Sequence, residues 1–293
     1  MRTIRSSVMI LPPAYVSTAP LQHVVVDGRD RRYRVYRPAG LSHDRAVPMV
    51  VVLHGGFGTG EQAERSYGWD AAANRHRLVV VYPDGVGRSW NAGNCCGPAQ
   101  REGVDDVAFL KTVIARVTTT EHIDPLRVAV AGISNGGMMA YRMACDSGLP
   151  LRAVGSVSGT METPCLHPAK TSLMEIHGMS DRNIPYYGGD GMGPAHAVTA
   201  PIPDVAARWR AIDGCGPAAL RRENGYQTLD AVCPNGLRVD LVSIPGAGHQ
   251  WPQGVPPPKA AVALANRLGI AGLDPPSQVL DATEMLYAFF FTR

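Results

Sequence analysis

The sequence predicts an α/β fold: a mostly parallel, doubly wound sheet with helices on both faces and an antiparallel hairpin near its N-terminus. Three observations lead to this prediction. Short apolar runs alternate along the chain with longer segments of helical periodicity. The runs at 48–53 and 78–82 are continuous, which is typical of parallel strands buried on both faces. A glycine-flanked serine follows a third run and leads into a helical pattern at 138–144.

The elements follow in chain order. Residues 23–26 and 32–36 predict the hairpin, because Asp27-Gly28 between them favours a tight turn. The long Gly-rich segment 83–102 predicts a loop that covers a site. Further strands are expected at 127–133, 153–157, 173–176 and 237–244, and helices at 69–77, 105–121, 204–212 and 282–291.

Composition limits the class of protein. The 293 residues, 45% of them hydrophobic, suffice for one large core. The net charge of +3 comes from scattered residues, which argues against a nucleic-acid partner. No apolar run is long enough to span a membrane. Residues 1–20 predict an irregular lead-in or the remnant of an export signal, because Pro12 and Pro13 interrupt the apolar run that begins at Val8.

The six cysteines form no C-x-x-C pair, which argues against zinc and favours disulfides. Disulfides in turn indicate an oxidising location, so we expect a secreted or periplasmic protein; buried free thiols are the alternative. Cys215 and Cys233 flank the weakly apolar segment 216–232 and are predicted to form a disulfide. Cys145 and Cys165 are the next pair, and Cys95 and Cys96 are either joined to each other or free.

The glycine-flanked serine lies in the pentapeptide 132–136, Gly-Ile-Ser-Asn-Gly, which is a G-x-S-x-G pattern between a strand and a helix. In that context the turn holds Ser134 in a strained conformation, with glycines where side chains would collide with the neighbouring strand and helix. The helix N-terminus and the N–H of Asn135 would favour negative charge beside the hydroxyl. The alternative is an ordinary Gly-rich turn.

A serine hydroxyl needs a base and a group that orients the base. In α/β-hydrolases the chain order is serine, acid, histidine, each in a loop after a strand. Asp181 lies just after the strand at 173–176, and His249 lies in the glycine-rich turn after the strand at 237–244. These residues complete the predicted triad with Ser134. Asp190 and Asp204 are alternative acids that lie further from the strand end.

An oxyanion needs two fixed N–H donors. One is expected from Asn135, and the second from the loop 54–57, at Gly56 or alternatively at Phe57. His54 is interpreted as structural, and His177 as a packing residue that hydrogen-bonds the acid loop. Trp90 and Trp251 either wall a substrate pocket or pack in the core.

Several motifs appear in the order of a known family. They are Leu53-His-Gly-Gly, Tyr82-Pro-Asp-Gly with Trp90-Asn, Asp105-Asp-Val-Ala-Phe-Leu, Gly132-Ile-Ser-Asn-Gly-Gly-Met-Met, His177-Gly with Asp181 and Ile184-Pro-Tyr, Gly248-His-Gln-Trp-Pro, and the last helix from Leu280. Together they resemble the esterase/polyhydroxybutyrate depolymerase family of LpqC-like proteins, which is related to feruloyl esterases of carbohydrate esterase family 1.

The resemblance implies an α/β-hydrolase catalytic domain over residues 21–293 and a secreted carboxylic-ester hydrolase that needs no cofactor or metal. It implies a small-molecule or polymeric ester as substrate, since members act on feruloyl, acetyl, polyester and small model esters. Oligomeric state is not predicted. Two residues depart from the family pattern: Gln250 stands where Thr or Ser is more common, and Phe57, in place of a small residue, could narrow the acyl pocket.

Two other functions use the same residues. An acyltransferase would pass the acyl group to a sugar or lipid hydroxyl instead of water, and product analysis with an added acceptor alcohol separates the two reactions. A catalytically inactive binding protein would leave Ser134 inert toward a fluorophosphonate probe.

Overall fold

The computed structural model describes residues 17–193, 198–267 and 274–292. Its main sheet contains ten strands: β1 (Leu21–Val26), β2 (Arg29–Tyr36), β3 (Val47–Leu53), β4 (Val79–Pro83), β5 (Ile123–Ile133), β6 (Ala153–Val157), β7 (Ser172–Gly178), β10 (Ala219–Glu223), β11 (Tyr226–Val232) and β12 (Arg238–Ile244). The helices are α1 (Gly60–Ser66), α2 (Trp69–His76), α3 (Gly97–Arg101), α4 (Asp106–Thr120), α5 (Asn135–Asp146), α6 (Ile202–Asp213), α7 (Lys259–Arg267) and α8 (Ala282–Phe291). A short ribbon of β8 (Gly189–Asp190) and β9 (Val198–Thr199) lies apart from the sheet.

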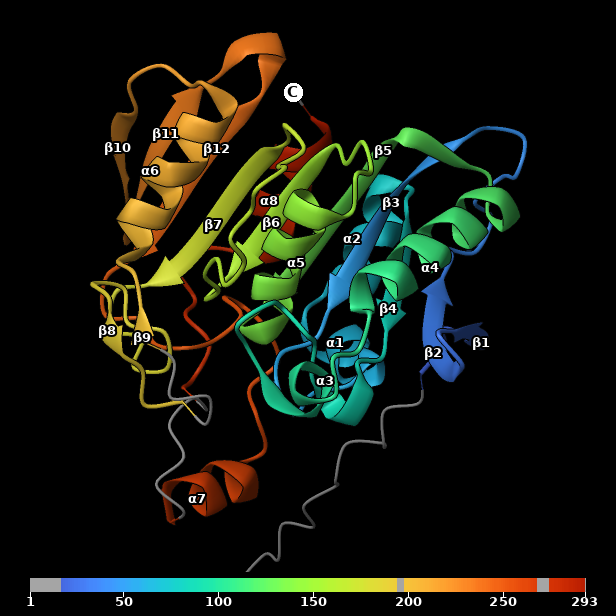
Figure 1. The fold of residues 1–293 in the computed structure, drawn as a ribbon, viewed down its shortest axis with the longest axis horizontal. Helices are drawn as coiled ribbons and strands as arrows, with labels where there is room; N and C mark the ends of the chain where they lie inside the picture. The colour runs from blue at the N-terminus through green and yellow to red at the C-terminus, as the bar shows by residue number, and fades with distance from the viewer. Residues whose placement is uncertain (1–16, 194–197, 268–273, 293) are drawn as a thin grey trace, which may run out of the picture.

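The strand order is β1-β2-β4-β3-β5-β6-β7-β12-β11-β10 (Figure 1). The six inner strands, from β4 to β12 in that order, are parallel. At each edge two further strands pair in antiparallel fashion. At one edge β2 pairs with β4 and β1 with β2, and at the other β11 pairs with β12 and β10 with β11. The chain passes from β3 to β4 on one side and then returns to β5 on the other side of β3. This reversal makes the C-terminal ends of β3 and β5 a topological switch point, where ligands of open α/β sheets bind.

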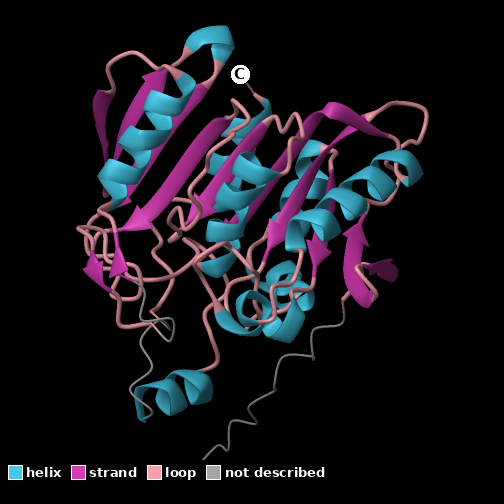
Figure 2. Cartoon of the chain, viewed as in Figure 1, coloured by secondary structure: helices cyan, strands magenta, loops and turns pink. Residues whose placement is uncertain are grey.

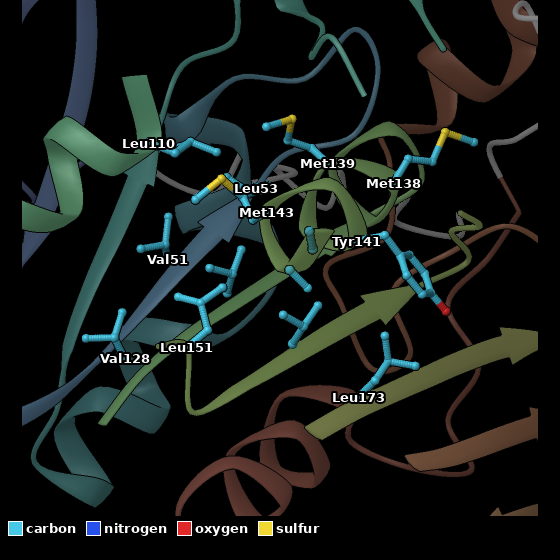
Figure 3. Packing of buried hydrophobic residues seen from close by; sticks show 14 of the residues in the cluster. Val51, Leu53, Leu110, Val128, Met138, Met139, Tyr141, Met143, Leu151 and Leu173 are labelled. Atoms are coloured by element: carbon cyan, nitrogen blue, oxygen red, sulfur yellow. The ribbon is translucent and has the colours of Figure 1, made fainter. Parts of the chain in front are cut away.

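Helices cover both faces of the sheet, as Figure 2 shows. One core lies between the sheet and α4, α5 and α6, and a second lies between the opposite face and α1, α2 and α8. Figure 3 shows part of the first core, where side chains of α5 such as Met139 and Met143 lie over the strand residues Val51 and Leu53. Successive residues of a strand point to opposite faces, so the continuous apolar runs of β3 and β4 supply both cores. The α/β fold class predicted from these runs is confirmed.

Some elements differ from the sequence-based expectation. The polar segment 216–232 contains the hairpin β10–β11, which adds two strands to the sheet edge. Every residue of β10 is exposed, so the strand lacks the alternation of apolar and polar residues by which a half-buried strand is recognised in a sequence. The covering loop 83–102 contains a 3₁₀ turn, Val86–Arg88, and helix α3. Most of the expected lead-in 1–20 lies outside the described residues.

Three disulfides join the cysteines: Cys95 to Cys96, Cys145 to Cys165, and Cys215 to Cys233. The third disulfide links the segment after α6 to the end of β11. Beside it, the N–H of Gly216 donates to the carbonyl oxygen of Val232 at 3.0 Å. This disulfide therefore closes the base of the exposed edge hairpin. None of the described helices combines the length and apolar character needed to cross a bilayer.

The double variant Cys215→Ser/Cys233→Ser is expected to lose about 3 kcal/mol of unfolding free energy, because the disulfide closes a loop of this size in the unfolded chain. Denaturant titration followed by circular dichroism measures the change. Equal stability of variant and parent, or recovery of Cys215 linked to another cysteine in non-reducing peptide maps, would contradict the assignment.

Candidate functional site

Ser134 occupies the turn between β5 and α5, at the C-terminal end of a parallel strand. The elements β5 and α5 are labelled in Figure 1. Its backbone has a φ of 55° and a ψ of −125°, a region that non-glycine residues rarely adopt. The N–H of Ser134 donates to the carbonyl oxygen of Val157 on β6 at 2.9 Å, which holds the turn against the sheet. This is the strand-turn-helix geometry expected for an exposed nucleophile.

The two glycines that flank Ser134 are required by close backbone approaches. A Cβ at Gly132 would lie 2.4 Å from the carbonyl carbon of Gly136. A Cβ at Gly136 would lie 2.5 Å from the carbonyl oxygens of Leu53 and His54, at the end of β3. Backbone atoms cannot move aside as a flexible side chain can, so the glycines let the helix start directly against β3.

Asp181 and His249 are in direct contact. His249 Nδ1 lies 2.8 Å from Asp181 Oδ2, and the other carboxylate oxygen accepts the N–H groups of Asn183 at 2.8 Å and Ile184 at 3.0 Å. Burial alone would raise the pKa of Asp181, but the charge and hydrogen bond of His249 outweigh it and lower the pKa below its ordinary value. An ionised carboxylate accepts the Nδ1 hydrogen, which leaves Nε2 of His249 as the basic nitrogen.

The loop that carries His249 is held by a residue the sequence analysis did not identify. Asp274 Oδ2 accepts the backbone N–H of His249 at 2.8 Å. Gln250, one of the departures from the family pattern, accepts the N–H of Ser277 at 3.0 Å through its side chain. These bonds tie the histidine turn to the segment before α8. Asp274 has no local pattern that marks it, because it lies 25 residues along the chain from its partner.

The loop after β3 lies beside Ser134, since a Cβ built at Gly55 would be 3.5 Å from the Cβ of the serine. Phe57, the alternative donor, uses its N–H in a 2.8 Å bond to the carbonyl oxygen of Arg88. Within the described residues, the backbone N–H groups of Gly56 and Asn135 have no hydrogen-bond acceptor. The geometry therefore favours Gly56 over Phe57 as the partner of Asn135.

His54 is structural, as expected. Its ring is completely buried, Nδ1 donates to the carbonyl oxygen of Gly55 at 2.8 Å, and Nε2 accepts the N–H of Gly85 at 3.0 Å. Burial lowers its pKa to about 4. The neutral ring thus joins the loop after β3 to the covering loop.

Trp90 and Trp251 do not form an exposed wall of the site, so this part of the prediction is wrong. Trp90 is completely buried, and Trp251 is 4% exposed. The Trp251 ring stacks on Tyr67, and its Nε1 donates to Thr283 Oγ1 at 3.1 Å. Both indoles pack in the interior, which was the alternative. Phe57, by contrast, is 68% exposed and remains available to a ligand.

Trp90 has a role that its sequence context did not indicate. Its backbone N–H donates to Asn135 Oδ1 at 2.6 Å, and its carbonyl oxygen accepts from Asn135 Nδ2 at 2.9 Å. Its indole Nε1 donates to the carbonyl oxygen of His54 at 2.9 Å. One tryptophan therefore joins the two chain segments that present Gly56 and Asn135.

The described residues contain one cluster of potential metal ligands, formed by Asp213, Cys215 and Cys233. The two cysteines are joined in a disulfide, so they offer no thiolate to a metal ion. This cluster lies at the base of the edge hairpin and is unrelated to Ser134.

Comparison with known proteins identifies the family. The model of the family described as Esterase PHB depolymerase matches residues 31–186. A protein named as an esterase, NocK of Nocardia uniformis subsp. tsuyamanensis, is 31% identical over 277 residues, covering 86% of this chain and 80% of its own. Feruloyl esterase B of Piromyces equi is 26% identical over 236 residues, covering 75% of this chain but only 42% of the relative.

A solved structure shares the fold. The structure of LpqC, a poly(3-hydroxybutyrate) depolymerase from Bordetella parapertussis, matches with a TM-score of 0.52 and 23% identity, covering 80% of this chain and 86% of that one. The family match and the sequence relatives confirm the resemblance noted from the motifs. They also show that this chain is a carboxylic ester hydrolase. The chain belongs to the Esterase PHB depolymerase family.

Proposed function

We propose that this chain is a serine esterase that cleaves carboxylic esters through an acyl-enzyme at Ser134. One combination of observations supports the proposal most strongly. Ser134 is held at positive φ on a strand-to-helix turn, while the 2.8 Å pair of His249 and Asp181 is carried by loops at the same edge of the sheet. Membership of an esterase family supports the same chemistry.

In the first step, Nε2 of His249 takes the proton of the Ser134 hydroxyl as its oxygen attacks the ester carbonyl. Asp181 holds the ring in the required tautomer through Nδ1 and stabilises the imidazolium that forms. The Asn183 and Ile184 N–H groups fix the carboxylate, so it does not have to reorganise during the reaction.

The negative charge that develops on the carbonyl oxygen would be stabilised by the N–H groups of Asn135 and Gly56. Asn135 is also the first residue of α5, so the helix dipole adds to the stabilisation. His249 then protonates the departing alcohol. Water repeats the cycle on the acyl-enzyme and releases the acid.

The substrate class is proposed as a small-molecule or polymeric ester, following relatives named as feruloyl esterases and polyester depolymerases. A panel of methyl ferulate, p-nitrophenyl acetate and hydroxybutyrate oligomers tests it, with a fluorophosphonate probe as an independent report on the nucleophile. Hydrolysis of none of them, together with an unlabelled serine, would favour the binding-protein alternative. Ester products formed with an added acceptor alcohol would favour the acyltransferase.

The proposed location is outside the cytoplasm, in the periplasm or the medium. Three disulfides among the described residues support an oxidising compartment.

Ser134→Ala is expected to lower kcat on the order of 10⁴-fold or more, because no other group can form the acyl-enzyme. Ester hydrolysis measures the loss, and unchanged circular dichroism shows that the fold is intact. A variant that keeps a tenth of the parent activity would rule out Ser134 as the nucleophile.

Asp181→Asn is expected to lower kcat roughly 10⁴-fold, because the amide favours the wrong tautomer of the imidazole. The matched controls Asp190→Asn and Asp204→Asn change exposed carboxylates on β8 and α6 and should keep nearly full activity. If either control lost as much activity as Asp181→Asn, the triad acid would have to be reassigned to that residue.

A further inference from the structure

A second histidine–carboxylate pair lies behind the acid of the proposed triad. Glu175 and His177 are two residues apart on β7 and therefore point to the same face of the sheet, toward α5. Both side chains are completely buried. Figure 3 shows Tyr141 reaching from α5 toward the β7 residue Leu173, on the same face. The mechanism above uses neither Glu175 nor His177, yet buried ionisable groups are costly to keep in a core.

The partners of His177 determine where its hydrogens lie. Nε2 is 2.9 Å from the carbonyl oxygen of Ile184 and 3.5 Å from Asp181 Oδ2. A backbone carbonyl can only accept, so Nε2 carries a hydrogen. Nδ1 is 2.9 Å from Glu175 Oε1. A second hydrogen is therefore shared between the ring and this carboxylate.

The surroundings of Glu175 decide which group holds that second hydrogen. The N–H of Gly159 donates to Oε1 at 3.3 Å, and the hydroxyl of Tyr141 lies 3.2 Å from Oε2. Burial raises the pKa of Glu175 above its ordinary value, while the hydrogen bond and charge of His177 act in the opposite direction. Donors to both oxygens favour the ionised carboxylate. Burial alone would lower the pKa of His177, but the hydrogen bond and charge of Glu175 outweigh it and raise the pKa above its ordinary value.

The other elements around the ring add no competing charge within the described residues. Tyr186 lies with its ring centre 6.0 Å from that of His177, and its hydroxyl bonds Ser243 on β12 at 2.6 Å. The described ion-pair contacts of His177 are those with Glu175 and Asp181. On the far side, Asp181 Oδ2 is shared with His249. The two imidazole rings thus contact the same carboxylate oxygen.

We propose that Glu175 and His177 are positioning residues, and that Glu175 keeps His177 as an imidazolium whose charge holds Asp181 ionised beneath His249. This inference rests on the proposed triad. The nearby positive charge disfavours protonation of Asp181, whose pKa the charge of His177 helps to lower. The free enzyme therefore keeps the acid of its proposed triad ionised to a lower pH than it would without the pair.

The variants His177→Gln and Glu175→Gln test the proposal. In the first variant the new amide side chain can still donate to the carbonyl oxygen of Ile184, but it carries no charge. In the second variant the buried ring loses its counter-ion and becomes neutral. Each variant is expected to move the acidic limb of the kcat/KM profile upward by about 0.5–1 pH unit, with the largest loss of activity below neutral pH.

The double variant should show the same shift as each single variant, because all three leave no imidazolium beside Asp181. In His177→Gln the buried carboxyl of Glu175 loses its counter-ion and takes up a proton, so no new charge is left behind. His76→Gln is the control, since it removes a similar histidine–carboxylate contact, 2.8 Å to Glu284, between α2 and α8. Its profile should match that of the parent. An equal loss of kcat/KM at every pH, or an unchanged acidic limb in both single variants, would show that the pair has only a packing role.

Nitrogen-15 NMR of the parent protein, labelled at histidine, tests the charge state without relying on activity or on the folding of a variant. Both ring nitrogens of His177 are expected to carry a hydrogen at neutral pH, where a free histidine side chain is mostly neutral. A signal from an unprotonated nitrogen of this ring would overturn the proposal. This outcome is separable from the triad itself, because activity lost in Ser134→Ala would still identify the nucleophile.

Discussion

Ser134 adopts a φ of 55°, a conformation that costs a non-glycine residue about 1–3 kcal/mol. Such a residue keeps this conformation only when its surroundings leave no alternative, and here three features do so. The serine N–H is bonded to β6, α5 begins at the next residue, and two glycines allow the turn to touch the neighbouring backbone. The position of the Ser134 side chain is therefore fixed by the backbone, and the loops that carry His249 and Asp181 follow β12 and β7 at the same edge of the sheet.

The two proposed oxyanion donors lie after different strands, Gly56 after β3 and Asn135 after β5, so their separation depends on contacts between the two segments. Trp90 performs this task in the structure through its backbone contact with Asn135 and its indole contact with His54. The loop 83–102 is therefore part of the frame of the site. A loop rich in glycine can do this because its buried tryptophan, and not its backbone alone, supplies the rigidity.

The sequence predicted those strands and site residues that a short stretch of neighbouring residues is enough to identify. The continuous valine runs identified the parallel strands, and the chain order of Ser134, Asp181 and His249 identified the candidate triad. Long-range contacts were not predictable in this way. Asp274 bonds a partner 25 residues away, and the side chain of Asn135 bonds Trp90, 45 residues away; nothing in the local sequence indicates either contact. The hairpin β10–β11 was missed because β10 has no buried face.

The exposed strand β10 has a further consequence for the protein in solution. It forms one end of the ten-stranded sheet, and its sequence, Ala219-Leu-Arg-Arg-Glu223, places consecutive charges along that end. A free strand edge is a template on which another chain can add a strand, the first step of many aggregation reactions. At this edge an incoming strand would have to pack beside Arg221, Arg222 and Glu223. The same polarity that made the strand hard to recognise thus protects the sheet from growing beyond the molecule.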